Sequence, residues 1–94
     1  MTKELFDIGD LVISIKGRDS GSVYMIITKP TDKLVRVVDG DLRKTINPKL
    51  KNVLHIKHTG INLDKIKEKL LSSEKVFDSE IYSAIKKSIE SKIS

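Results

Sequence analysis

Basic side chains gather in the first two thirds of this 94-residue chain, and they are the residues whose chemistry is clearest. Residues 1–60 hold eleven Lys and Arg against seven Asp and Glu, whereas residues 61–94 hold seven against six. Ammonium and guanidinium groups bind phosphate, so a basic surface indicates an anionic partner such as nucleic acid. The same excess also keeps many small proteins soluble, and charge alone leaves both interpretations open.

Two segments carry the cations that we expect to contact phosphate. Lys16 and Arg18 flank Gly17 in a polar turn, which would project their charges from a rigid loop. A second group surrounds the turn that contains Pro48 and would share one edge of a closed sheet. The candidate contacts are Lys16, Arg18, Arg43, Lys44, Lys49, Lys51, His55 and Lys57. Arg43 is the first choice, because a guanidinium can hold a phosphate through two hydrogen bonds or stack on an unpaired base.

No group of residues in the chain indicates catalysis. The chain has no Cys, its acidic residues are scattered over turns and expected helix starts, and its two histidines lack a paired nucleophile. His55 and His58 are three residues apart on an expected strand, which places them on opposite faces and disfavours a metal site. We therefore expect a protein that is not an enzyme and that uses no cofactor and no metal.

Apolar alternation and frequent turns predict an all-β domain over residues 1–60. Leu11, Ile13 and Ile15 recur at the two-residue period of a strand with one buried face. The expected strands cover residues 11–15, 22–29, 34–38, 42–46 and 53–57, with a break at residues 47–49. The structural turns contain Gly17, Gly21 and Gly40. Five strands separated by turns at nearly every ten residues indicate a small β-barrel.

A helical extension is predicted over residues 61–94, because the apolar period changes after Gly60 from two to three or four residues. Asn62 would cap a first short helix that ends at residues 72–73, and Asp78 would cap a second. One face of the second helix carries Ile81, Ile85, Ile89 and Ile93. This stripe must be buried against the barrel, another protein or a second copy of the chain.

Several of these segments resemble the KOW motif of ribosomal and transcription-associated proteins. The similar residues are Gly9, Gly17-Arg18-Asp19-Ser20-Gly21, Val37-Val38-Asp39-Gly40, Arg43, Pro48 and Lys51-Asn52-Val53-Leu54-His55. They are similar to the branch related to an archaeal and eukaryotic large-subunit ribosomal protein, in a short bacterial form. The resemblance implies a five-stranded SH3-like (KOW) barrel that binds RNA through polar loops and basic strand faces. Ser22 departs from the pattern, since many members carry Lys directly after the glycine that Gly21 matches.

The resulting prediction is a cytoplasmic, non-enzymatic RNA-binding protein that associates with ribosomal RNA or the ribosome. With four aromatic residues, the chain favours recognition of phosphates and shape in structured RNA over base stacking. No apolar run is long enough to cross a membrane or to form a signal peptide. The alternative is a protein-interaction module that uses the barrel groove or the stripe of the second helix, with a protein partner or self-association through residues 61–94.

Overall fold

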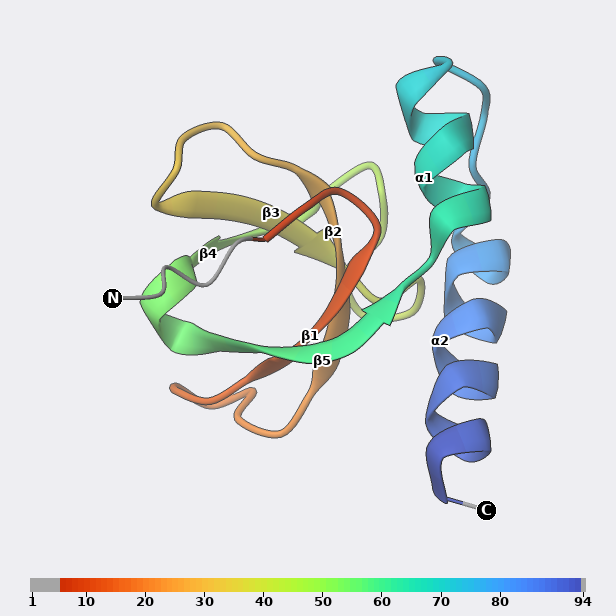
Figure 1. The fold of residues 1–94 in the computed structure, drawn as a ribbon. Helices are drawn as coiled ribbons and strands as arrows, with labels where there is room; N and C mark the ends of the chain where they lie inside the picture. Colours follow the sequence, from red (N-terminus) through yellow and green to blue (C-terminus); the bar gives the residue numbers. More distant parts are fainter. Residues whose placement is uncertain (1–5, 94) are drawn as a thin grey trace.

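The computed structural model describes residues 6–93, with side chains through residue 90. The strands are β1 (Asp10–Ser14), β2 (Val23–Thr28), β3 (Leu34–Val38), β4 (Lys49–Asn52) and β5 (Ile56–Asn62). The helices are the 3-10 helix η1 (Val53–His55), α1 (Asp64–Leu71) and α2 (Asp78–Ile93). Figure 1 shows the curved strands on one side of the molecule and the two α-helices on the other. The predicted class, mainly β with a helical C-terminal part, is confirmed.

The five strands form one antiparallel sheet in the order β4-β3-β2-β1-β5. β1 pairs with both β2 and β5, so that Val12 lies opposite Tyr24 on one side and opposite His58 on the other. The pairing of β1 with β5 shifts its register between Asp10 and Val12. The pairing of β2 with β3 shifts its register near the end of β2. Such irregularities bend strands and increase their twist.

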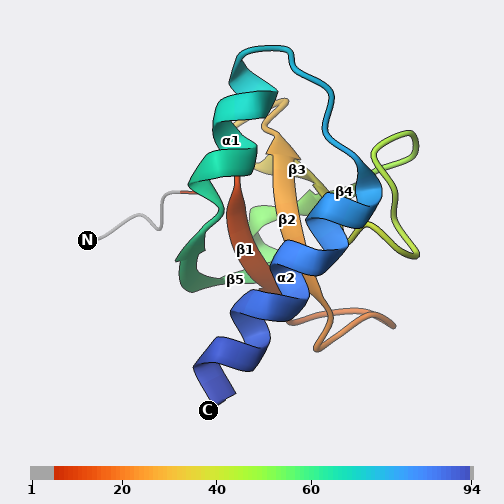
Figure 2. The ribbon, with the colours of Figure 1, turned by 90° about the vertical axis from the view of Figure 1, so that its right-hand side faces the viewer.

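Both faces of this sheet are buried. One core contains Phe6, Val12, Tyr24, Ile26, Val35, Val37 and Ile56. On the opposite face, Leu11, Met25 and Val38 pack against Ile66 of α1 and against Ile81 and Ile85 of α2. Figure 2 shows the two helices lying across the strands of this second face. The helical part therefore completes a core that the sheet cannot close alone.

The expected single buried face of the first strand was wrong. Leu11 and Val12 are adjacent in the chain, point to opposite faces of the sheet and are both fully buried, whereas Ile15 is exposed. A strand that is covered on both faces needs consecutive apolar residues instead of strict alternation. The helices that cover the second face account for the difference.

The expected fourth strand was wrong, and the fifth strand lies later in the chain than expected. Residues 42–46 lie in a loop, and β4 begins at Lys49, directly after the proline that was expected to end a strand. Asn52 then caps η1 by accepting a hydrogen bond from the Leu54 N–H. The last strand begins at Ile56 and continues through Gly60, whose φ of 86° is accessible to glycine, as far as Asn62.

The two helices begin differently from the prediction. Asn62 does not cap α1, because its Nδ2 donates to Asp10 Oδ1 and to the Ile8 carbonyl. Asp78 is the first residue of α2, and its Oδ1 accepts a hydrogen bond from the Thr45 N–H. The predicted end of α1 is confirmed, since Ser72 is its C-cap. Ile93 lies in α2, but its side chain is outside the described residues.

Candidate nucleic-acid interface

The loop between β1 and β2, residues 15–22, is closed by its own backbone. The Gly21 N–H donates to the Ser14 carbonyl at 2.7 Å, and the Ser22 N–H donates to the Asp19 carbonyl at 2.9 Å. Gly17 and Gly21 have φ values of 93° and 94°, which side-chain-bearing residues rarely adopt. The chain therefore reverses tightly here.

A carboxylate at the centre of this loop binds four side chains from three strands. Asp19 Oδ2 accepts hydrogen bonds from Lys49 Nζ and the Tyr24 hydroxyl, both at 2.8 Å. Its Oδ1 accepts from the Ser14 hydroxyl and Lys51 Nζ, both at 2.9 Å. Burial raises the pKa of Asp19, but these four hydrogen bonds outweigh burial and hold the pKa well below its ordinary value. Asp19 is consequently an anion that ties the loop to β1, β2 and β4.

The two lysines that contact Asp19 differ in what they can still bind. Lys51 is 7% exposed, and its ammonium donates to Ser14 Oγ, Asp19 Oδ1 and the Lys16 carbonyl, which uses all three of its donors. Lys49 is 31% exposed along its side chain, and Asp19 is its acceptor among the described residues. Lys49 therefore retains donors for an external anion, whereas Lys51 lies beneath the surface.

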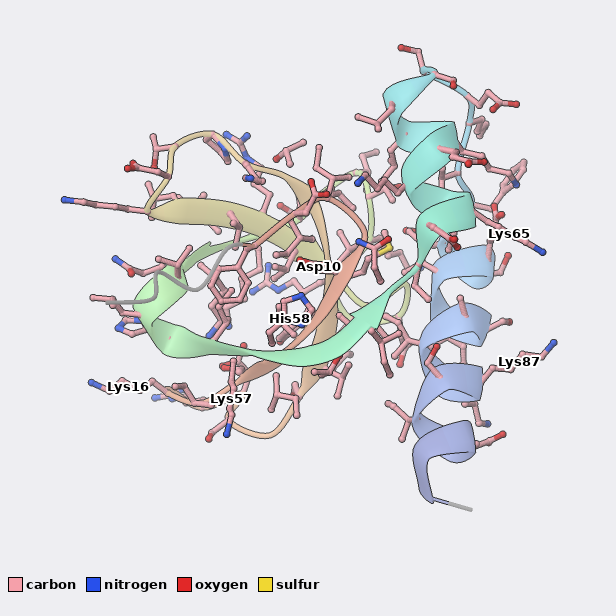
Figure 3. The ribbon with its side chains drawn as sticks, viewed as in Figure 1. Asp10, Lys16, Lys57, His58, Lys65 and Lys87 are labelled. Atoms are coloured by element: carbon pink, nitrogen blue, oxygen red, sulfur yellow. The ribbon has the colours of Figure 1, made fainter. Side chains whose placement is uncertain are left out.

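Two further candidates lie beside this loop, His55 at the end of η1 and Lys57 in β5. The Ile15 N–H donates to the His55 carbonyl at 2.9 Å, and Lys57 is opposite Ile13 in the pairing of β1 with β5. Figure 3 shows Lys16 and Lys57 at the same end of the molecule, away from Lys65 and Lys87 on the helices. We call Lys16, Arg18, Lys49, His55 and Lys57 the loop surface.

The structure places Arg43 and Lys44 on a different part of the chain, the loop of residues 39–48. Asp39 Oδ1 accepts hydrogen bonds from the N–H groups of Asp41 and Arg43, and the Thr45 N–H reaches Asp78. The contacts of this segment are thus with itself and with the start of α2. Arg43, our first choice from the sequence, lies outside the loop surface as we define it.

The same loop presents two apolar side chains to solvent. Leu42 is 86% exposed and Ile46 is 91% exposed, although hydrogen bonds hold the backbone around them. Sequence reasoning assigned both to a strand and so missed this feature. It also gave Asp19 no role beyond the turn, because nothing in the local pattern indicates that a carboxylate will meet lysines thirty or more residues away.

His58 has a structural role in a separate cluster. Its Nε2 lies 2.8 Å from Asp10 Oδ2, its Nδ1 accepts a hydrogen bond from the Gly60 N–H, and its ring stacks on Phe6. We expected His55 and His58 on opposite faces of one strand. This expectation was wrong, because His55 belongs to η1. Across residues 6–93, no cluster of three or more His, Asp or Glu side chains is arranged to hold a metal ion.

No α-helix in the described part of the chain has the length and apolarity needed to cross a membrane.

Comparison with known proteins adds no relative. No family model matches the chain, and no curated protein matches it. The resemblance to the KOW motif accordingly rests on the residues quoted above.

Proposed function

We propose that this protein binds structured RNA by contacting backbone phosphates with the loop surface. The observation that carries the proposal is that most cations of the loop surface are exposed and form no ion pair in the described part of the chain. Lys16, Arg18 and Lys57 are exposed and have no ion pair within the described residues. On the helices, Lys67 pairs with Asp7 and Lys69 pairs with Glu80, whereas Lys65, Lys86 and Lys87 are exposed without an ion pair among the described residues. The loop surface differs from the helices in carrying its cations on and beside a loop that its own backbone closes. Unpaired cations on a closed loop are suited to an anionic ligand.

Phosphate contact is favoured over base recognition. Base-stacking proteins present exposed aromatic rings beside a basic groove. Here Tyr24 is buried and donates to Asp19, and Phe6 is buried against His58. Neither of these rings is free to stack on a base, and the exposed rings, Phe77 and Tyr82, lie at the start of α2 and outside the loop surface. The proposed ligand is therefore the backbone of structured RNA, with little dependence on base sequence.

We further propose that the sheet closes as an SH3-like barrel of the KOW type. β4 and β1 are separated by two strands in the sheet order, yet Lys51 of β4 donates to Ser14 of β1 at 3.0 Å. A flat sheet would hold these residues far apart, so the contact supports strong curvature. Together with the quoted KOW-like residues, this supports a ribosomal RNA or ribosome-associated protein that acts in translation in the cytoplasm.

The salt dependence of RNA binding tests the proposal. Four cations, Lys16, Arg18, Lys49 and Lys57, are available, and neutralising about four phosphates predicts a log–log slope of roughly −3 to −4. A short double-stranded RNA, titrated at several salt concentrations by fluorescence anisotropy, provides the measurement. A second duplex of unrelated sequence should bind with similar affinity. Absence of binding at low salt would contradict the proposal.

Interaction with another protein is the second candidate, and the exposed Leu42 and Ile46 favour it. Large apolar side chains held in solvent by an ordered loop are typical of recognition sites. The stripe on α2 does not support this alternative, because Ile81 and Ile85 are buried against the sheet. If the wild-type protein lacks RNA affinity, this loop becomes the first region to examine.

A further inference from the structure

We infer that Asp19 is a positioning residue for the proposed RNA site: its carboxylate fixes the loop of residues 15–22 and the Lys49 ammonium in the arrangement that receives phosphate. This inference rests on the proposed function. It assigns an acidic residue a favourable role in binding an acidic ligand, which charge alone would not suggest.

Asp19 fixes the orientation of Lys49. A free lysine side chain samples many rotamers and loses that freedom when it binds a ligand. Asp19 Oδ2 lies 2.8 Å from Lys49 Nζ and holds it near the surface before any ligand arrives. Because the ammonium has three donors, it can keep this contact while it donates to a phosphate.

Asp19 also acts on the backbone that carries Lys16 and Arg18. The Lys16 carbonyl lies 3.1 Å from Ser14 Oγ, whose single proton it shares with Asp19 Oδ1, and it accepts a hydrogen bond from Lys51 Nζ at 3.4 Å. Both of these donors also bind Asp19 Oδ1. Asp19 therefore orients the two groups that hold the Lys16 carbonyl, and its removal would loosen the backbone beside Gly17.

Two effects of Asp19 on RNA affinity have opposite signs and can be separated. Its negative charge repels nearby phosphates, so its removal should tighten binding if charge alone matters. Its hydrogen bonds reduce the ordering cost of binding, so its removal should weaken binding if positioning dominates. We infer that positioning dominates, since four donors already bind the carboxylate and two of them are ammonium groups that offset its charge.

The test compares Asp19→Asn with Asp32→Asn in the full chain. Asp32 is exposed in the loop between β2 and β3, so its replacement raises the net charge equally without disturbing the loop surface. We expect Asp19→Asn to weaken binding to a short double-stranded RNA by about three- to tenfold. Asp32→Asn should leave the affinity unchanged or slightly improve it. Both are measured at a temperature where circular dichroism shows each variant to be folded.

The slope of affinity against salt separates positioning from a purely structural role. If Asp19 only stabilises the fold, the folded variant should bind RNA with wild-type affinity and wild-type slope. If it positions Lys49 and the loop, the slope should become shallower by about one, because a phosphate contact is lost. Tighter binding by Asp19→Asn, or an unchanged affinity and slope, would overturn the inference and leave the proposed function intact. Absence of wild-type binding would overturn both.

A second variant keeps the inference testable if Asp19→Asn does not fold. Tyr24→Phe removes one of the four hydrogen bonds to Asp19 without changing the charge. We expect it to bind RNA about twofold more weakly and to show faster hydrogen exchange at the Gly21 N–H, which closes the loop. Wild-type affinity together with faster exchange at Gly21 would overturn the positioning role.

Discussion

The ammonium of Lys51 lies 2.9 Å from Asp19 Oδ1, although the two residues are 32 positions apart in the chain. This contact fastens β4 to the loop between β1 and β2 and turns a residue that we expected on the surface into part of the interior. Its neighbour in the cluster, Lys49, contacts the same carboxylate from the solvent side. Two lysines of one strand thus have different roles.

Replacement of these two lysines should affect stability unequally. We expect Lys51→Met to lower the free energy of unfolding by about 1–3 kcal/mol, because it removes donors from buried Ser14 and from partly buried Asp19. Lys49→Met, which removes a partly exposed pair, should cost less than about 1 kcal/mol. Chemical denaturation followed by circular dichroism measures both. Equal losses would show that burial of Lys51 does not matter to stability.

The environment of Tyr24 predicts an unusual alkaline titration. Burial and the hydrogen bond to Asp19 raise the pKa of Tyr24 to about 12, from an ordinary value of about 10. Because the folded pKa is raised, the associated stability is fully present below about pH 10 and is lost as the pH rises toward 12.

Absorbance of the phenolate checks this titration in a Tyr82→Phe variant, which leaves Tyr24 as the single tyrosine. We expect a midpoint near 12 in the folded protein. In denaturant the midpoint should fall to about 10. A midpoint near 10 in the folded protein would contradict the buried hydrogen bond.

Contact between the loop of residues 39–48 and α2 can be tested at Gly40. A Cβ at this position would collide with the Asp78 carbonyl oxygen and lie 2.8 Å from the Tyr82 nitrogen. Gly60 has a similar φ, 86° against 80°, but no atom lies within 4 Å of its Cβ position. We expect Gly60→Ala to cost about 1–2 kcal/mol of stability through backbone strain alone. Gly40→Ala should cost clearly more, and an equal loss would mean that this loop does not pack against α2.

The shared core of sheet and helices predicts a large effect at Ile81. This side chain is fully buried against Leu11, Met25 and Val38. We expect Ile81→Ala to lower the free energy of unfolding by about 2–5 kcal/mol in a single cooperative transition. Leu71→Ala, at an exposed position of α1, should change it by no more than about 0.5 kcal/mol. A small loss at Ile81 would indicate that the helices are not docked on the sheet.

The sequence predicted those parts of the fold that depend on local pattern. β3 matches the predicted bounds, because residues 34–38 are dense in β-branched side chains between two turns. The stripe of Ile81 and Ile85 was correctly expected to need a partner surface, which proved to be the second face of the sheet. The burial of that face was not predictable from β1 alone. Adjacent apolar residues such as Leu11 and Val12 do not show by themselves whether one or both faces of a strand are covered.

The remaining features depend on contacts that are distant in sequence. Residues 42–46 have the composition of a short strand, but hydrogen bonds to Asp39 and Asp78 hold the segment that contains them as a loop. Lys51 carries the same charge as any surface lysine, and only its meeting with Asp19 places it inside. No local periodicity reports such pairs, so the sequence could not place the candidate residues relative to one another.

Two matched triple variants test the central claim most directly. The first changes the loop surface by Lys16→Gln, Arg18→Gln and Lys57→Gln. The control removes equal charge from the helices by Lys65→Gln, Lys86→Gln and Lys87→Gln; Figure 3 shows Lys65 and Lys87 on that other side. All six side chains are exposed, so both variants should fold normally.

Their affinities for the same short double-stranded RNA, measured across a range of salt concentrations, are the decisive result. We predict that the loop-surface variant binds at least about tenfold more weakly at low salt, with a log–log slope shallower by about 2 to 3. The helix variant, which has the same net charge, should stay close to wild type in slope. Equal weakening of the two variants would show that net charge alone governs binding and would contradict an RNA site on the loop surface.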